Sequence, residues 1–271
     1  MTQWFFILAD SELELIPKEI VNERSILNNA RARGKAPEKL LLDASHHHPA
    51  FARLPDSERR GRPDIVHFFL MLCIDSDLSL EGKLHAFVHT RNNDVIAVKP
   101  ETRLPPHYPR FVGLIESLYE QRVVPSRENA LLELRNEVPL EVLVKALKPD
   151  EVLVLTPAEL QTPLLEIFAP LKDVERVVVI IGGFSKGDFR SDLSKFKHTK
   201  VSLGPRLQKV WTVTYKLFSA IQYAGKAPEA KVKDAGKAPE AKVKDAGKTP
   251  EEKVKATKPS KPRRAPKKKE E

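Results

Sequence analysis

Short apolar runs alternate with stretches of helical spacing along the first 223 residues. The apolar runs are too short for helices, so each predicts a strand. The expected strands are Trp4–Ala9, Leu40–Asp43, Leu84–His89, Val95–Val98, Val152–Leu155 and Arg176–Ile181. Between them, apolar side chains that recur three and four positions apart predict helices. The expected helices are Ile16–Ala32, Pro63–Ile74, Phe111–Val123, Leu140–Leu147 and Arg206–Tyr223.

The order of these elements predicts an α/β fold in which residues 1–223 form one domain. The run from Val177 to Ile181 is apolar at every position. Such a run is typical of a central parallel strand with both faces buried.

The segment 224–271 has a different composition. AGKAPEAKVKD occurs twice in succession, at Ala224–Asp234 and Ala235–Asp245, and each copy contains a Gly and a Pro that break helices. No aromatic residue follows Tyr223, so nothing in this segment can bury a core. We therefore expect a disordered basic tail. The tail has two possible roles that the sequence does not separate: it attracts phosphate groups regardless of RNA sequence, or it only keeps the protein soluble.

The net charge of +9 is concentrated in this tail, which carries 16 of the 46 basic and 8 of the 37 acidic residues. The remaining 30 basic and 29 acidic residues nearly cancel, so an RNA site in the folded part must be a local cluster. Cys73 is the single cysteine, which excludes an internal disulfide and fits a reducing compartment. The N-terminal apolar run is too short for a signal peptide, and no run approaches the roughly 20 residues of a membrane span. We expect a soluble, cytoplasmic protein without a membrane partner.

A glycine-rich segment follows the most apolar strand. The sequence Gly182-Gly183-Phe184-Ser185-Lys186-Gly187 begins where that strand ends, and open α/β sheets bind ligands at the carboxyl ends of their strands. The spacing matches neither a dinucleotide fingerprint nor a phosphate-binding loop, which argues against a nucleotide-dependent oxidoreductase. Taken alone, the pattern favours a tight structural turn.

Two basic segments are candidates for contact with RNA. Arg59, Arg60 and Arg62 precede Pro63, and Asp64 can hold the guanidinium of Arg62 in a fixed pose. A solvated, charged helix start is the alternative. The segment RLPPHYPRF, residues 103–111, combines basic and aromatic groups suited to RNA.

Two further clusters have weaker implications. The triplet His46–His48 lacks the spaced partners that complete a metal site, so we predict no metal. The turn Asp75-Ser76-Asp77 offers a carboxylate base, or it simply ends the preceding helix.

Five motifs occur in a recognisable order: LLDASHHH, GRPDIVH, DSDLSLEGKLHAFVHT, RLPPHYPRFVGL and IIGGFSKGDF. Together they resemble the pseudouridine-specific N1-methyltransferases of ribosome biogenesis, the nucleolar essential protein family, in an archaeal-like form. The resemblance implies a SPOUT-type α/β fold with a C-terminal trefoil knot, S-adenosyl-L-methionine as cofactor and a homodimer. It also implies small-subunit rRNA as substrate and a role in small-subunit assembly, with assembly factors or ribosomal proteins as further partners. The alternative is an rRNA-binding assembly factor without catalysis.

The resemblance also assigns residues. The cofactor side comprises Thr156, Gly182, Gly187, Ser202, Leu203, Gly204, Pro205, Arg206 and Leu207. The RNA side comprises Arg62, Asp64, Arg103, His107 and Arg110. We expect Arg62 to stabilise negative charge on the base, and Asp75, or a water that it positions, to accept the proton. Two departures stand out: Pro106 replaces a common arginine, and VSLGPRL is shorter than the usual cofactor segment.

Overall fold

The computed structural model describes residues 1–157 and 162–224. Nearly all of the segment expected to be a disordered tail, residues 225–271, lies outside the described residues. The last helix reaches Ala224, one residue into the range that composition assigns to the tail. None of the helices in the described ranges is long and apolar enough to cross a membrane.

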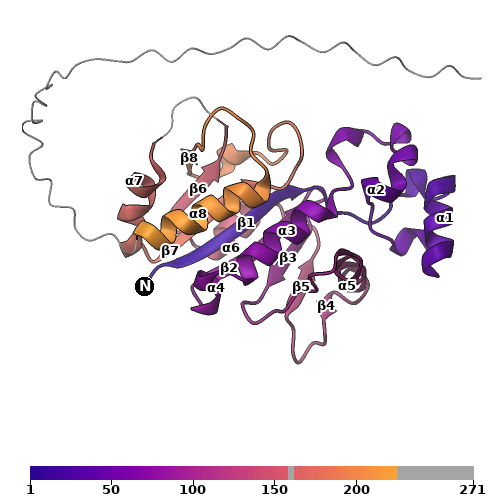
Figure 1. The fold of residues 1–271 in the computed structure, drawn as a ribbon, viewed down its shortest axis with the longest axis horizontal. Helices are drawn as coiled ribbons and strands as arrows, with labels where there is room; N and C mark the ends of the chain where they lie inside the picture. Colours follow the sequence, from indigo (N-terminus) through magenta and orange to yellow (C-terminus); the bar gives the residue numbers. More distant parts are fainter. Residues whose placement is uncertain (158–161, 225–271) are drawn as a thin grey trace, which may run out of the picture. The chain divides into compact units, whose positions relative to one another are not determined.

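Eight strands of the described chain form one mixed sheet in the order β4-β5-β3-β2-β1-β7-β6-β8 (Figure 1). Strands β2, β1, β7, β6 and β8 run parallel to one another, whereas β3, β5 and β4 extend the sheet beyond β2 with antiparallel pairing. The strands are β1 (Gln3–Ser11), β2 (Leu84–Thr90), β3 (Val95–Val98), β4 (Val123–Val124), β5 (Leu132–Arg135), β6 (Glu151–Leu155), β7 (Arg176–Gly182) and β8 (Thr199–Val201). The prediction of a central parallel strand is confirmed, because β7 lies between β1 and β6.

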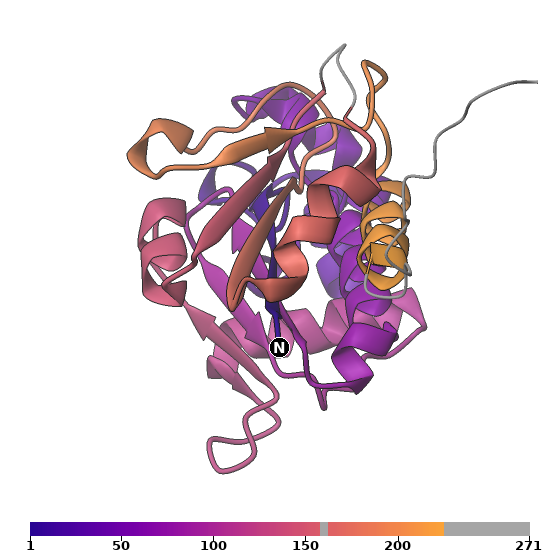
Figure 2. The same ribbon diagram turned by 90° about the vertical axis from the view of Figure 1, so that its left-hand side faces the viewer.

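Helices cover both faces of this sheet, because successive side chains of a strand point to opposite sides. On β1, Trp4 and Phe6 belong to the core cluster under α3 (Pro63–Ile74), α5 (Tyr108–Gln121) and α8 (Val210–Ala224), while Phe5 and Ile7 belong to the cluster under α6 (Leu140–Leu147). Figure 2 shows the strands between α8 on one side and α6 on the other. Two short helices, α4 (Asp77–Leu80) and α7 (Leu164–Phe168), lie near the ends of α3 and α8.

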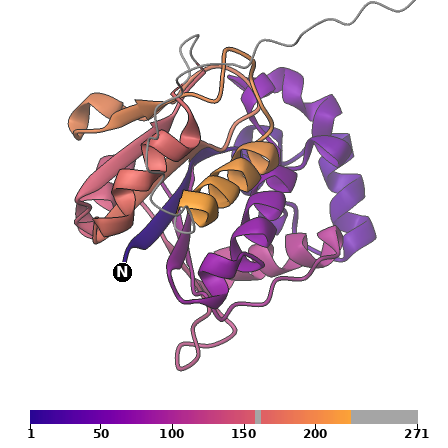
Figure 3. The same cartoon turned by 60° about the vertical axis from the view of Figure 1, so that its left-hand side comes forward.

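Residues between β1 and α3 form a small layer with its own core (Figure 3). It contains α1 (Arg24–Arg33) and α2 (Ala44–His47), and Ile20, Ile26 and Leu42 are fully buried in it. The buried carboxylate of Glu116 on α5 ties it to the sheet domain by accepting hydrogen bonds from Arg33, Lys35 and the Leu41 amide.

Most predicted elements are confirmed, and α3 and α6 match their predicted ranges fully. Three predictions are wrong. Residues 40–43 form only a single bridge between Leu15 and Leu41, because Asp43 instead caps α2. The helix expected over 16–32 is split, since extended Glu23 separates a 3-10 turn at Lys18–Ile20 from α1. The last helix begins at Val210 rather than Arg206, and residues 206–209 border a cavity.

Candidate active site

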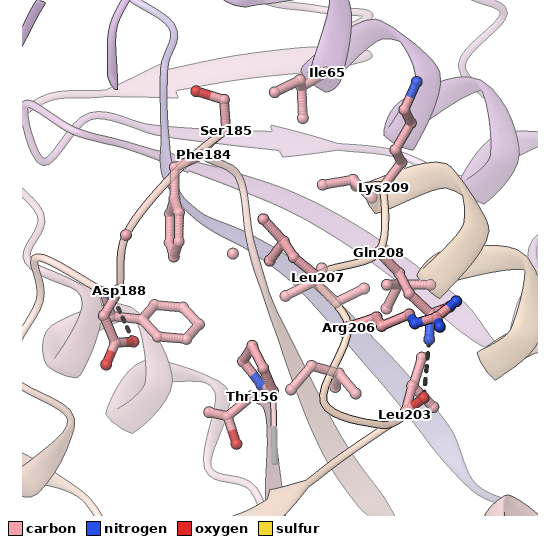
Figure 4. A pocket seen from close by; sticks show the side chains of 18 of the residues that line it. Ile65, Thr156, Phe184, Ser185, Asp188, Leu203, Arg206, Leu207, Gln208 and Lys209 are labelled. Atoms are coloured by element: carbon pink, nitrogen blue, oxygen red, sulfur yellow. Dashed lines mark hydrogen bonds between the residues drawn. The ribbon is translucent and has the colours of Figure 1, made fainter. Parts of the chain in front are cut away.

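A cavity of about 430 Å3 lies at the carboxyl ends of β6 and β7, where a parallel sheet places ligands (Figure 4). We call it the glycine-loop cavity. Four stretches of chain line it: the start of α3, the residues after β6, the loop after β7 and the segment that leads into α8. The lining comprises Arg62, Ile65, Leu155, Thr156, Pro157, Ile181, Gly182, Phe184, Ser185, Gly187, Asp188, Phe189, Leu203, Gly204, Arg206, Leu207, Gln208, Lys209, Val210, Trp211 and Val213.

The loop after β7 is fixed by contacts with the segment that precedes α3. Arg59 donates a hydrogen bond to the carbonyl oxygen of Asp188 at 2.7 Å, and its guanidinium lies 4.7 Å from the ring centre of Phe184. Gly187 has a φ of +76°, and a Cβ there would lie 3.3 Å from the Arg59 guanidinium. A glycine is needed at that position because it adopts left-handed backbone without strain. Arg59 therefore contacts this loop at Phe184, Gly187 and Asp188.

The segment between β8 and α8 forms the opposite wall. The Ser202 hydroxyl accepts a hydrogen bond from the Gly204 amide at 3.1 Å, and Gln208 donates to the Leu203 carbonyl at 2.9 Å. These two contacts bend the chain so that Leu207, which is 65% exposed, borders the cavity instead of entering the core. Figure 4 shows Leu203 and Thr156 on the side of the cavity away from Ser185 and Ile65.

The cavity lining includes seven of the nine residues that the resemblance assigns to the cofactor. They are Thr156, Gly182, Gly187, Leu203, Gly204, Arg206 and Leu207. Ser202 and Pro205 are not part of the lining, and Ser202 shapes the loop through Gly204.

Arg62 and Asp64 form a fixed pair at the start of α3. The Arg62 Nε and one terminal nitrogen donate to the two carboxylate oxygens of Asp64 at 2.8 and 2.7 Å. This bidentate contact is the main cause that raises the pKa of Arg62. The Arg62 side chain remains 36% exposed and also lines the glycine-loop cavity. A fixed, permanently charged group therefore faces the space beside the glycine loop.

The other residues expected to contact RNA lie on the segment that enters α5. Arg103, His107 and Arg110 are all exposed. Their segment packs against α3, because His67 contacts the Pro105 carbonyl at 2.9 Å and lies 4.4 Å from the Phe111 ring. The segment that carries the three basic side chains thus lies beside α3, the helix whose N-cap is Arg62.

The structure does not bring Asp75 to this cavity. Asp75 is the C-cap of α3, whereas Arg62 is its N-cap, and 12 helical residues separate them. At 1.5 Å per residue, the two caps are about 20 Å apart. Asp75 instead lines a second cavity with Ser76 and Asp77, and Ser76 caps α4. The turn interpretation fits this geometry, and Asp75 cannot accept a proton beside Arg62 of the same chain.

A buried carboxylate that sequence reasoning missed lies behind the cavity wall. Glu12 is 1% exposed, and its Oε1 accepts hydrogen bonds from the Ser185 amide at 2.7 Å and the Ser185 hydroxyl at 2.9 Å. Burial raises the pKa of Glu12, although Ser185, Arg62 and Arg59 oppose that shift. The available signal was a pair of acidic residues, Glu12 and Glu14, that alternate with leucines directly after a buried strand.

The histidine triplet lies in and directly after α2. His47 is buried, and burial lowers its pKa to about 4. Within the described ranges, no group of three or more His, Cys, Asp or Glu side chains has a metal-binding arrangement.

The cavity suits an adenosyl group bound with its methionine part. Its volume lies within the range of small-molecule sites, roughly 300–1,000 Å3. Leu155, Ile181 and Leu207 supply apolar surface, while the glycine loop supplies backbone groups that a ligand can approach closely.

Comparisons with known proteins agree with this picture. A family model described as EMG1/NEP1 methyltransferase matches residues 6–222. The ribosomal RNA small subunit methyltransferase Nep1 of Thermococcus sibiricus is 44% identical over 226 residues, which cover 81% of this chain and 96% of that protein. Nep1 of Thermococcus onnurineus is 45% identical over 207 residues, covering 76% and 92%.

A solved structure, Archaeoglobus fulgidus Nep1 bound to S-adenosylhomocysteine, is similar with a TM-score of 0.72 and 36% identity. The match covers 83% of this chain and 99% of that one. With a family model that spans nearly the whole described chain, relatives above 40% identity and a matching fold, this chain belongs to the EMG1/NEP1 methyltransferase family.

Proposed function

We propose that this protein transfers a methyl group from S-adenosyl-L-methionine to N1 of a pseudouridine in small-subunit rRNA. Family membership supports methyl transfer, and the relatives are named as methyltransferases of small-subunit rRNA. The solved relative binds S-adenosylhomocysteine, which is what remains of this cofactor once its methyl group has left. The choice of pseudouridine N1 comes from the motif resemblance.

One observation carries the proposal: Arg62 lines the same cavity as the glycine loop. Arg62 is fixed by Asp64, as groups that recognise phosphate or a base edge often are. A base held by Arg62 and a cofactor held by the loop would therefore meet inside one space. Proximity of this kind lowers the barrier without new chemistry.

When bound, the cofactor supplies a methyl group already activated by its sulfonium sulfur. The protein then has to hold and orient the two reactants. Leu155, Ile181 and Leu207 would contact the adenosyl group, and Gly182 and Gly187 would let the backbone approach it. The guanidinium of Arg62 would stabilise negative charge that develops on the base as N1 loses its proton.

Pseudouridine and uridine differ at the reacting atom. The sugar of pseudouridine is attached to carbon, so N1 carries a hydrogen, whereas N1 of uridine is bonded to the sugar and cannot accept a methyl group. A stacked or paired target has to leave its helix to enter the cavity. The exposed Arg103, His107 and Arg110 would hold the flanking RNA backbone, since such contacts position a substrate.

We further propose that two chains form a homodimer through α3 and α8. An aromatic face is exposed there: Phe68 on α3 is 49% exposed, its ring lies 4.9 Å from that of Trp211, and Tyr215 on α8 is 66% exposed. Contiguous exposed apolar side chains of this kind favour an isologous interface. We also propose that the chain forms a trefoil knot, in which α8 and the segment before it are threaded through a loop.

The proposed substrate also suggests where the protein acts. An enzyme that modifies small-subunit rRNA would act in the cytoplasm during small-subunit assembly, beside assembly factors or ribosomal proteins. The basic tail would add affinity for RNA.

The test uses a small-subunit rRNA hairpin that contains pseudouridine, beside the same hairpin with uridine. Mass spectrometry after incubation with enzyme and cofactor should detect one added methyl group on the first RNA only. Methylation of both would overturn the specificity for N1. Calorimetric titration with S-adenosylhomocysteine separates the non-catalytic alternative, because a protein that only binds rRNA has no need of a cofactor site.

A further inference from the structure

Removal of the N1 proton requires an acceptor near the cavity. Three other carboxylates of the described chain come into question. Asp75 lies at the far end of α3, Asp64 has both oxygens bonded to the guanidinium of Arg62, and Asp188 is exposed and accepts from the Phe189 amide at 2.8 Å. A carboxylate that is distant, already paired or open to water is poorly placed to take the N1 proton of a nucleobase in the cavity. The acceptor therefore has to be sought behind the cavity wall.

Glu12 lies directly behind that wall. Its carboxylate is 1% exposed, its Oε1 bonds to Ser185, and its Oε2 is buried without a hydrogen-bond partner in the structure. A buried carboxylate oxygen without a partner is destabilised, and such groups call for a functional explanation. Protonation of Glu12 would remove the charge that burial disfavours.

Ser185 connects this carboxylate to the cavity. Its hydroxyl donates to Glu12 at 2.9 Å, and the residue lines the cavity on the same side as Ile65 of α3 (Figure 4). A hydroxyl has one proton and two lone pairs. Two acceptors lie within reach of that proton, Glu12 Oε1 at 2.9 Å and the Glu58 carbonyl oxygen at 3.2 Å. With the proton in the shorter contact, to Glu12, the lone pairs can accept a hydrogen bond from a group in the cavity.

The same carboxylate is linked to the arginine expected to hold the base. The Arg62 amide donates to the Glu12 backbone carbonyl at 3.0 Å, so residue 12 and the start of α3 are joined through the main chain. Ser185, Glu12 and Arg62 thus form one connected group at a single edge of the cavity.

We propose that Glu12, acting through the Ser185 hydroxyl, accepts the proton that leaves N1 of the target base. The inference rests on the proposed function. The N1–H proton passes to Ser185 Oγ while the Ser185 proton passes to Glu12 Oε1. The electron pair left on N1 forms the bond to the methyl carbon, and the carbon–sulfur bond breaks with its pair on sulfur. Glu12 ends neutral and returns the proton to solvent after product release.

The charged groups that face Glu12 agree with this role. Arg62 at the start of α3 and Arg59 from the preceding turn both lower the pKa of Glu12, whereas burial raises it and outweighs them. Lys186 on the glycine loop is engaged elsewhere, since it pairs with Glu58 at 2.9 Å. Glu12 is therefore a stronger base than an exposed carboxylate.

The test measures single-turnover methyl transfer to the pseudouridine hairpin between pH 5.5 and 9. Glu12→Gln keeps an oxygen acceptor for Ser185 but cannot take a proton, and Ser185→Ala removes the connection. Glu58→Gln is the matched control, because its carboxylate is exposed and pairs with Lys186 of the same loop. Calorimetry with S-adenosylhomocysteine and thermal unfolding are run on every variant.

We expect both variants to lose about 100-fold or more in rate, with affinity for S-adenosylhomocysteine changed by less than about threefold. The wild-type rate should fall at acid pH as Glu12 protonates. The plateau above that acid limb should vanish in Glu12→Gln, whose rate should instead rise steadily up to pH 9 because hydroxide then removes the proton.

Three results would overturn the inference: a Glu12→Gln rate close to wild type, a Glu12→Gln pH profile that keeps the wild-type plateau, or a rate loss that only follows lost cofactor affinity. If the wild-type protein does not methylate the pseudouridine hairpin, the proposed function is wrong. That failure is distinguishable from failure of the Glu12 inference, because it is seen in the wild type without any variant. Ser185→Ala provides a second route if Glu12→Gln does not fold.

Discussion

The guanidinium of Arg62 and the carboxylate of Asp64 share two hydrogen bonds, 2.8 and 2.7 Å long, across the first turn of α3. The pair is two residues apart in sequence, and Pro63 between them opens the helix. The backbone of α3 therefore fixes the carboxylate, and the carboxylate in turn fixes the direction in which the guanidinium points.

Asp64→Asn should weaken this hold without removing either side chain. An asparagine offers one acceptor oxygen instead of two and no charge, so Arg62 will sample several poses. We expect the KM for the RNA hairpin to rise about tenfold, a loss of about 1.4 kcal/mol, while affinity for S-adenosylhomocysteine stays the same. An unchanged KM would mean that the carboxylate of Asp64 is not needed to orient the Arg62 side chain.

Arg62→Ala should nearly abolish methylation and leave cofactor binding intact. The expected loss in single-turnover rate is about 100-fold or more, as for the removal of a donor that stabilises developing charge. Arg62→Lys keeps the charge but not the planar fork, so it should recover only part of the rate. Turnover at the wild-type level in the alanine variant would exclude Arg62 from the site.

The sequence predicts the sheet order poorly but the elements well. Continuous apolar runs mark β1 and β7, because both faces of these strands are buried. Helical spacing of apolar residues marks α3 and α6. Nothing local specifies that β1 pairs with both β2 and β7, since those contacts join distant segments.

The candidate site is predicted only where chemistry leaves a compact motif. Arg62 with Asp64 and the glycine loop are such motifs. Glu12 is different: its importance arises from the long-range contact with Ser185, 173 positions away. Asp75 was a plausible base by residue type, and only the length of α3 excludes it from this cavity.

Two glycines should respond oppositely to alanine. In Gly183→Ala the new Cβ would lie 2.9 Å from Ser11 Cα and from Leu8 Cγ, so the backbone of β1 must move. We expect a loss of about 1–3 kcal/mol in the free energy of unfolding. Gly113→Ala lies in α5 with nothing within 4 Å of the new Cβ, and it should gain about 0.5–1 kcal/mol. Urea denaturation of both variants measures the difference, and equal effects would contradict the crowding at Gly183.

Stability should fall as pH decreases from about 6.5 to 4, partly because of His47. Its pKa is lowered to about 4 in the folded protein, chiefly by burial. Between the two values the unfolded chain binds the proton and the folded chain does not, so acid favours unfolding, by about 2–3 kcal/mol at pH 4. Below about pH 3 both states carry the proton and this contribution is constant. His47→Gln should reduce the pH dependence measured by denaturation at pH 7 and 4.5, whereas exposed His46→Gln should change it much less, because burial is the largest cause of the His47 shift and His46 a minor one.

Two glutamates on α5 allow a matched test of burial. Glu116 is 1% exposed and holds Arg33 and Lys35, while Glu120 is 57% exposed and pairs with Lys39. Glu116→Gln should lower the free energy of unfolding by about 2–4 kcal/mol, because the cations around the buried carboxylate lose their charged partner. Glu120→Gln should not change stability measurably, as is usual for exposed pairs. Hydrogen exchange should also increase in α1 of the first variant only, and equal costs would argue against a burial effect.

The place of β1 between β2 and β7 has a consequence for how the chain is made. Gln3 pairs with Arg176, so the first strand to emerge during synthesis waits for a partner that is translated near the end of the domain. Closing so long a loop is entropically unfavourable, and contacts of high sequence separation form slowly. Until then β1, apolar on both faces, presents an open edge to other chains. A nascent chain that stalls before residue 176 is therefore expected to aggregate or to recruit a chaperone.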